Sequence, residues 1–348
     1  MLFSLEDDRG DAVRGYCVPD AFSVTPRLRI CDADRVLLVI EANEVREALV
    51  AAGRHETGRC GFHLDEKLLP GLRDLANLGI YDDETGLLIY RRRRPDMMER
   101  KIVRLETHLY PLWRFDEALR ELFQYYGRGV DAYGRETVTQ MFLLNKMNSI
   151  YLSGRLLYRN FASYIDAGFK VFCLVQDPHE ELAERLLILS KIRKVGLQHL
   201  GPRDSMVFEP AAVFAESLDL TDARALKRAF RRAPESVARA LSNPLTRQMT
   251  AATPDEMPGA SAVAATLQAL ASFLVVGLRR QPHTLAVALG EHLRLDPESL
   301  PAPGQFPTVA PLAQILRETG CADLYLEKDI EVYHYLSGAM SLASEPAA

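Results

Sequence analysis

The sequence has few cysteines and no long apolar run. Its five cysteines stand apart and form no Cys-x-x-Cys pair, which argues against a zinc site or a disulfide framework and favours a reducing compartment. No stretch approaches the ~20 apolar residues that a membrane-spanning helix needs. Acidic residues follow soon after Met1, before a signal-type apolar region could form. Cytoplasmic residence is therefore the expectation.

Charge of one sign is also scarce. The chain of 348 residues has a formal net charge of −5, with 26% charged and 48% hydrophobic residues. These values are typical of an ordinary globular protein and predict no nucleic-acid partner. The length allows two domains, or one large domain with an elaboration.

Residues 1–92 are predicted to form a small β-rich module. Short apolar or alternating runs recur there, separated by Gly, Asp and Pro. Strands are expected at Arg27–Cys31, Val36–Ile40, Gly61–Leu64 and Gly86–Tyr90. A short helix is expected at residues 42–52, with Gly53 as its stop.

Residues 93–134 are predicted to form a basic linker and a helix. Arg91–Arg94 opens a basic run that extends to Arg104. One interpretation of this run is a solvated linker. The other is a patch for an acidic glycan or for anionic lipid, which would give peripheral contact with the inner-membrane surface. The spacing of apolar residues then predicts a helix over Phe115–Tyr126.

Residues 135–348 are predicted to form an α/β domain. The apolar runs Met141–Asn145 and Val171–Val175 are expected strands, each followed by a polar loop that opens a helix. This layout suits a phosphorylated nucleotide, because helix N-termini offer free N–H groups and a positive dipole end to anions. Further helices are expected at residues 221–241 with a break at Pro234, at 263–270, 284–293, 311–318 and 324–336, and a further strand at 272–277.

The loop Lys146–Leu152 has the residue types of a phosphate-binding loop. Lys146 supplies a point charge, and Ser149 supplies a hydroxyl beside free backbone N–H groups. Asn148 is acceptable where glycine is usual, because asparagine visits left-handed backbone geometry. A plain helix cap is the alternative for Ser149. The Gly-x4-Gly-Lys-Ser/Thr motif is absent from the chain.

Five segments, in the same order along the chain, resemble segments of the Golgi-type and bacterial polysaccharide sulfotransferases. They are Lys146–Leu152, Val171–Arg185, Leu241–Met249, Leu270–Arg280 and Ala322–Tyr335. The resemblance implies a P-loop-like parallel sheet flanked by helices. It also implies transfer of sulfate from 3′-phosphoadenosine 5′-phosphosulfate to a hydroxyl of a polysaccharide or glycolipid, with no metal ion.

The resemblance also implies roles for individual residues. Lys146, Asn148 and Ser149 would hold the 5′-phosphosulfate, and Lys146 would stabilise the developing charge. Gln176 belongs to the 3′-phosphate segment, and Arg247 would hold the 3′-phosphate, with an ordinary ion pair as the alternative.

The acceptor hydroxyl also needs a base. His108 is the catalytic candidate for this step, and a structural role is the alternative. Arg155 and Arg159 could line an acidic acceptor site or only solubilise a helix. A kinase or nucleotide hydrolase is disfavoured, because an evident carboxylate for Mg²⁺ is lacking.

Three residues depart from the family pattern. Gln176 stands in place of an arginine, Glu184 in place of a serine and Ile150 in place of a hydroxyl residue. Loss of a guanidinium–phosphate bond removes on the order of 1.5–3 kcal/mol. The alternative function is therefore a non-catalytic protein with this fold that binds glycan or assists polysaccharide assembly. The acceptor and the oligomeric state do not follow from the sequence.

Overall fold

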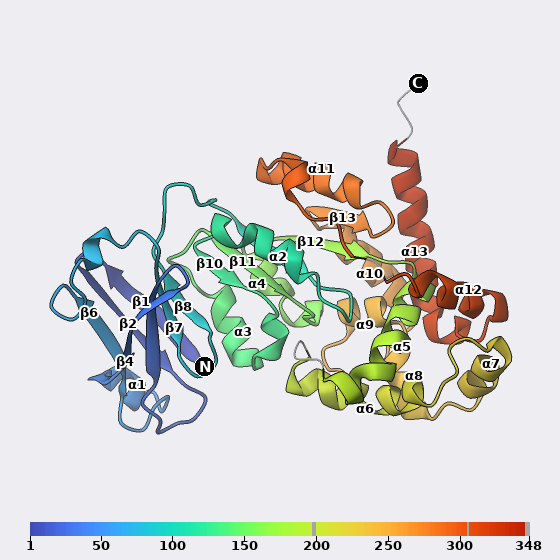
Figure 1. Ribbon diagram of the computed structural model, residues 1–348, viewed down its shortest axis with the longest axis horizontal. Helices are drawn as coiled ribbons and strands as arrows, with labels where there is room; N and C mark the ends of the chain where they lie inside the picture. Colours follow the sequence, from blue (N-terminus) through green and yellow to red (C-terminus); the bar gives the residue numbers. More distant parts are fainter. Residues whose placement is uncertain (197–199, 305, 345–348) are drawn as a thin grey trace. The chain divides into compact units, whose positions relative to one another are not determined.

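A computed structural model gives the fold and describes residues 1–196, 200–304 and 306–344 (Figure 1). The chain forms two compact units whose segments alternate along the sequence. The first unit consists of residues 1–102, 119–128 and 133–152, and the second of residues 103–118, 129–132 and the described residues from 153 onward. Composition predicted three consecutive segments with boundaries at 92 and 134 instead.

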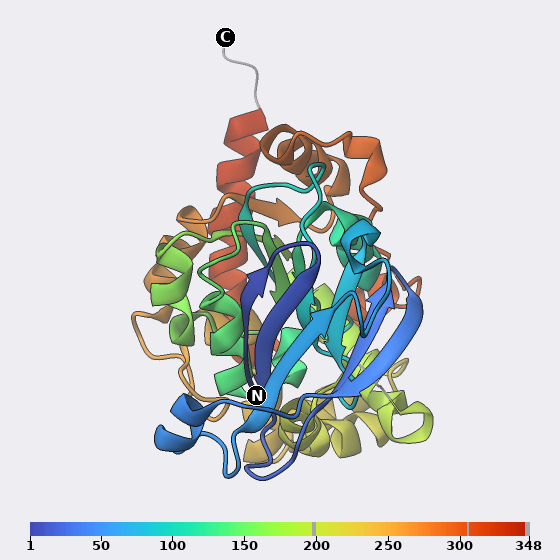
Figure 2. The ribbon, with the colours of Figure 1, turned by 90° about the vertical axis from the view of Figure 1, so that its left-hand side faces the viewer.

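The first unit contains two four-stranded antiparallel sheets, whose blue strands face the viewer in Figure 2. Their strand orders are β1-β2-β6-β5 and β4-β3-β7-β8. The bounds are β1 Leu2–Asp8, β2 Ala12–Val18, β3 Arg27–Asp32, β4 Arg35–Glu41, β5 Glu44–Val45, β6 Arg59–Asp65, β7 Leu78–Asp82 and β8 Leu88–Arg91. The predicted β-rich module, with strands near residues 27, 36, 61 and 88, is confirmed.

Alternation of side chains explains why these residues form strands. In β3, Leu28 and Ile30 are fully buried, whereas Arg27 and Arg29 are not. A period of two places one set of side chains on each face of a sheet. The apolar set can therefore pack inward while the arginines reach water.

A five-stranded sheet has the order β10-β11-β9-β12-β13. Its strands are β9 Lys101–Leu105, β10 Tyr125–Gly127, β11 Ile150–Gly154, β12 Lys170–Val175 and β13 Val275–Leu278. The pairs β10–β11 and β12–β13 are parallel, and helices flank the sheet (Figure 1). The α/β class is therefore confirmed. The strand predicted at Val171–Val175 is β12, and β13 begins three residues later than the strand predicted at 272–277.

Three secondary-structure predictions are wrong. Met141 and Phe142 end the helix α3, Arg135–Phe142, and the run 141–145 contains no strand. Ser149 precedes the strand β11 rather than a helix, and the predicted helix over Phe115–Tyr126 stops early, because Tyr125 and Tyr126 belong to β10. Short apolar runs have too few residues to distinguish a buried strand from the buried face of a helix.

The remaining helices lie mostly in the second unit. The α-helices are α1 Glu47–Ala51, α2 Trp113–Leu119, α3 Arg135–Phe142, α4 Ala162–Asp166, α5 Pro178–Val195, α6 Pro202–Glu216, α7 Ala223–Arg231, α8 Glu235–Leu241, α9 Pro244–Thr250, α10 Ala262–Ala271, α11 Pro282–Leu293, α12 Val309–Thr319 and α13 Asp323–Ser344. The break predicted at Pro234 separates α7 from α8. Among the described helices, none is long and apolar enough to cross a membrane.

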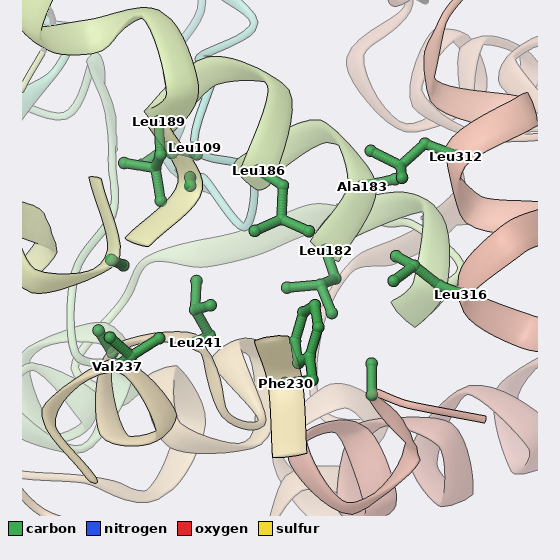
Figure 3. Close-up of a cluster of buried hydrophobic side chains, with 14 of the residues drawn as sticks. Leu109, Leu182, Ala183, Leu186, Leu189, Phe230, Val237, Leu241, Leu312 and Leu316 are labelled. Carbon is green, nitrogen blue, oxygen red and sulfur yellow. The ribbon is translucent and has the colours of Figure 1, made fainter. Parts of the chain in front are cut away.

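The core of the second unit forms around α5. Leu182, Leu186 and Leu189 are fully buried and share one face of the helix, because residues three and four apart lie above one another. Figure 3 shows these leucines among side chains of other helices, including Phe230 of α7 and Leu316 of α12. This packing holds α5 in place. The helix begins directly after the short loop that follows β12.

We expect Leu186→Ala to lower the free energy of unfolding by about 2–5 kcal/mol, because it leaves a cavity in this core. Urea unfolding measures the change. The matched control is Leu324→Ala, since Leu324 is 87% exposed and its truncation should change stability by no more than about 0.5 kcal/mol. Equal losses in the two variants would contradict the assigned core.

Candidate functional site

The topology of the five-stranded sheet marks one place for a ligand. β9 and β12 are neighbours in the sheet. The strands that follow them in the sequence lie at opposite edges, β10 at one edge and β13 at the other. In open parallel sheets, ligands bind outside the carboxyl ends of strands at such a switch point. The residues there follow β9 and β12 and belong to the second unit.

Buried charges fill the end of β9. Arg104 donates to both carboxylate oxygens of Asp116, at 2.6 and 2.8 Å, and to Oε2 of Glu106 at 2.8 Å. Burial alone would raise the pKa of Glu106. The Arg104 guanidinium and the backbone N–H of Leu112 outweigh that cost and hold this pKa well below its usual value. Glu106 is therefore a fixed anion at this position.

His108 lies fully buried beside this anion. Its Nδ1 is 2.9 Å from Oγ1 of Thr107 and 3.4 Å from Oε1 of Glu106. Its Nε2 has no hydrogen-bond partner among the described residues. The catalytic candidate chosen from the sequence is thus at the switch point, with one ring nitrogen held near a carboxylate.

Gln176 and Glu184 meet at the same place through Arg279, which follows β13. Arg279 donates to Oε1 of Gln176 at 2.6 Å, and its Nη1 lies 2.8 Å from Oε2 of Glu184. The second contact is an ion pair without hydrogen-bond geometry, so both Glu184 oxygens lack a donor among the described residues. Burial, with Glu181 nearby, raises the pKa of Glu184.

These side chains occupy the switch point themselves. His108, Glu184 and Arg279 are 0%, 1% and 3% exposed. Gln176 and Glu184 share Arg279 as their partner. The positive charge of Arg279 offsets part of the cost of burying the carboxylate of Glu184.

The loop around Lys146 lies elsewhere, in the first unit. Nζ of Lys146 donates to the backbone oxygen of Glu6 at 2.9 Å, and Asn148 is exposed. Ser149 is buried, and its Oγ accepts from the backbone N–H of Gln124 at 2.9 Å. Because the loop runs from a helix into a strand, the strand–loop–helix geometry on which the phosphate-loop prediction depended is absent here.

An open pocket in the second unit gathers arginines from four segments, and we call it the arginine pocket. It is lined by Arg155, Leu157, Arg185, Arg203, Asp204, Val207, Phe208, Pro244, Arg247, Gln248 and Pro254, with a cavity volume of ≈ 70 Å³. A second cavity of ≈ 400 Å³ shares Val207, Arg247 and Pro254 with it. Arg247, predicted to bind a phosphate, is therefore common to both cavities.

Carboxylates balance three of the four arginines. Arg155 pairs with Asp131 at 3.3 Å and also with Asp204. Arg203 also reaches Asp204, at 3.0 Å. Arg185 donates to Oε1 of Glu181 at 2.6 Å and stacks 5.7 Å above the ring of Phe208. These pairs hold the guanidinium groups in fixed positions around the cavity.

Arg247 differs from the other three. It is 7% exposed, and within residues 1–196, 200–304 and 306–344 it forms no ion pair with a carboxylate. Its Nη1 and Nη2 donate to the backbone oxygens of Arg239 and Ala240, at the end of α8. Burial and the positive charge of Arg185 lower the pKa of Arg247 to about 10, and the charges of Asp329 and Asp255 offset only part of this shift. A nearby anion would relieve both effects.

Hydrogen bonds between the segments Leu241–Met249 and Ala322–Tyr335 position Arg247. Asn243 adopts a left-handed conformation, with φ 43°, and its Oδ1 accepts from the N–H groups of Lys328 and Asp329. Asp329 in turn accepts from the N–H groups of Leu245 and Thr246, at 2.9 and 2.8 Å. The start of α9 is therefore tied to α13, and Arg247 lies in the last turn of this short helix.

Sequence reasoning missed Arg185 and Arg203 and assigned Arg155 to the wrong element. Arg155 follows β11 rather than lying in a helix, and Arg159 is exposed and pairs with Glu256 at 3.2 Å. The position of Arg155 directly after a strand was a usable signal. Arg203 gave none, because only tertiary packing brings α6 to this pocket.

Comparison of the sequence with protein-family models gives no match, and comparison with curated proteins gives no significant match. The resemblance to sulfotransferases therefore stays a prediction.

We expect Glu106→Gln to lower the free energy of unfolding at pH 7 by about 1–3 kcal/mol, because it removes one of the two buried carboxylates that accept from Arg104, while Asp116 remains. The pKa of Glu106 is lower in the folded than in the unfolded chain. Ionised Glu106 therefore adds to the free energy of unfolding at pH values above 4.5, the ordinary pKa of a glutamate. This stabilisation is lost as the pH falls below that value.

Urea unfolding at neutral pH and at about pH 3.5 measures this effect, and the difference between wild type and variant should shrink at the lower pH. Glu235→Gln is the control, since Glu235 pairs with Arg239 at the surface and should cost only about 0.3–0.5 kcal/mol. A difference that does not depend on pH would contradict the ionised state assigned to Glu106.

Proposed function

We propose that the second unit binds a ligand that carries a phosphate or sulfate group, and that this group occupies the arginine pocket. The observation that supports the proposal is the surroundings of Arg247, a buried cation beside Arg185 without a carboxylate of its own in the described chain. Planar guanidinium groups match tetrahedral oxyanions through paired N–H donors. An oxyanion would supply the missing negative charge.

The sizes of the two cavities fit such a ligand. A volume of ≈ 70 Å³ is a little more than twice the ~30 Å³ that one water occupies in the liquid, which suits a single oxyanion group. The adjoining cavity of ≈ 400 Å³ lies within the usual ~300–1,000 Å³ of small-molecule sites. A nucleoside or a sugar attached to the anionic group would occupy this larger space.

The sulfotransferase resemblance suggests two sources of the anionic group. One is 3′-phosphoadenosine 5′-phosphosulfate or its bisphosphate product, with the 3′-phosphate at Arg247 on a P-loop-like fold. The other is a sulfated polysaccharide or glycolipid.

Binding without catalysis is the better supported function, because side chains fill the switch point and Lys146 contacts the backbone of the first unit. The protein would then be a glycan-binding or assembly partner in polysaccharide synthesis.

Sulfate transfer is the second candidate function, and His108 is the observation that favours it. A base whose other ring nitrogen is oriented by a carboxylate is the usual arrangement for activating a hydroxyl. His108 has this arrangement with Glu106 at the switch point. Transfer would require Glu184 and Arg279 to move and open the site.

We expect 3′-phosphoadenosine 5′-phosphate to release heat on titration into the protein, and adenosine to release none. Arg247→Gln should weaken binding by about 10- to 100-fold, which corresponds to the ~1.5–3 kcal/mol of a charge-assisted hydrogen bond. Titration with glucose 6-sulfate tests the glycan source in the same way.

Arg159→Gln is the matched control, because Arg159 is exposed and does not line the pocket. Thermal unfolding of both variants separates lost binding from lost folding, since Arg247 also caps the end of α8. If neither ligand binds the wild type, or if Arg247→Gln binds as well as the wild type, the proposal fails.

The second candidate predicts transfer of labelled sulfate to a carbohydrate acceptor. His108→Gln should slow this transfer by roughly 10²–10⁴-fold, as expected for a general base. Lys146→Ala should leave it unchanged, because Lys146 bonds to Glu6 in the first unit. Transfer that disappears in Lys146→Ala would instead support the role predicted for Lys146 from its sequence motif.

A further inference from the structure

Helix α7 presents a face made only of cations. Its exposed side chains are all arginine or lysine, and Arg232 follows at its C-terminal cap. We call this set the α7 basic face, and its members are Arg224, Lys227, Arg228, Arg231 and Arg232. Residues three and four apart lie side by side on a helix, so the face forms one stripe about 11 Å long.

These five cations lack a carboxylate in ion-pair contact within the described part of the chain. Each is exposed, and no side chain among them takes part in an ion pair or hydrogen bond with a described residue. One carboxylate lies near, that of Asp222, and it accepts from two backbone N–H groups at the start of α7. The whole chain carries a net charge of −5, so this face is a local exception.

The other basic run of the sequence, Arg91–Arg94, shows the opposite behaviour. Arg92 pairs with Asp8 at 2.9 Å, and Arg94 pairs with Glu121 at 2.9 Å. Arg91 also reaches Glu121, at 3.2 Å, and Arg93 pairs with Glu99. Carboxylates of the first unit therefore neutralise Arg91–Arg94. The basic patch predicted from the sequence at this run is not a free cationic surface.

The chemistry of the α7 basic face limits its partner. The apolar side chains of α7, Leu226 and Phe230, are buried in the core of the second unit, so they are not available for insertion into a bilayer or a protein groove. The exposed side chains of α7 include no aromatic ring, amide or hydroxyl. Ammonium and guanidinium groups remain, and these recognise anionic groups by charge and by their N–H donors.

We propose that the α7 basic face binds the surface of an anionic lipid bilayer. Mobile lipid head groups can gather beneath clustered lysines and arginines without a shaped site, and such contacts are electrostatic and reversible. Figure 1 shows α7, in yellow, at the rim of the second unit beside α12, with its outward side uncovered by other elements of that unit. This surface is separate from the arginine pocket and does not depend on the function proposed for it.

The test is sedimentation of the full chain with vesicles of equal parts phosphatidylcholine and phosphatidylglycerol, and with vesicles of phosphatidylcholine alone, at about 0.1 M salt. The protein should pellet with the anionic vesicles only and should be released at about 0.5 M salt. Lys227→Glu/Arg228→Glu/Arg231→Glu should reduce partitioning by about fivefold or more for each cation reversed. The matched control reverses three paired, exposed arginines of the first unit, Arg9, Arg35 and Arg73.

The control variant has the same net charge as the α7 variant and should still bind the vesicles. Circular dichroism confirms that both variants fold. The proposal is overturned if the wild type does not distinguish anionic from neutral vesicles, or if the two variants lose binding equally. It is also overturned if dextran sulfate or duplex DNA binds the α7 basic face more tightly than the vesicles do, since the partner would then be a soluble polyanion.

Discussion

A buried guanidinium needs a negative charge, and this requirement governs the second unit. Most of its buried arginines meet the requirement internally, as Arg104 does with Asp116 and Glu106. Arg247 lies next to Arg185, donates to backbone oxygens and forms no ion pair with a carboxylate of the described residues, although the charges of Asp329 and Asp255 offset part of the repulsion. The cost of burying such a cation is several kcal/mol unless an anion compensates it. The ties between α9 and α13 hold Arg247 in this position, so the fold maintains an incomplete anion site.

The same chemistry has three different outcomes in one chain. At the switch point, His108, Glu184 and Arg279 close on one another and exclude solvent. In the arginine pocket, a comparable set of charges leaves an opening and an excess of positive charge. On α7, the cations are exposed to water and can contact the surface of an anionic bilayer. What separates these outcomes is whether each cation has a carboxylate within reach, and composition alone does not report this.

The sequence predicted those features that depend on local patterns. Alternation predicted the strands of the first unit. The polar loop after the apolar run Val171–Val175 predicted the start of α5, where Asp177 accepts from the N–H groups of His179 and Glu180. The strand prediction failed at Met141–Asn145, where four apolar residues fit a helix end as well as a strand. For the candidate site, the sequence pointed to Arg247 and His108. Arg185, whose charge lowers the pKa of Arg247, is brought beside it only by tertiary packing.

The account depends on an oxyanion that binds beside Arg247, and a crystal structure of the protein soaked with 3′-phosphoadenosine 5′-phosphate tests this most directly. The account predicts density for a phosphate in the arginine pocket, with its oxygens about 2.7–2.9 Å from guanidinium nitrogens of Arg247 and Arg185. A nucleotide bound over Lys146 and Ser149, or an arginine pocket that stays without the ligand at saturating concentration, would contradict it.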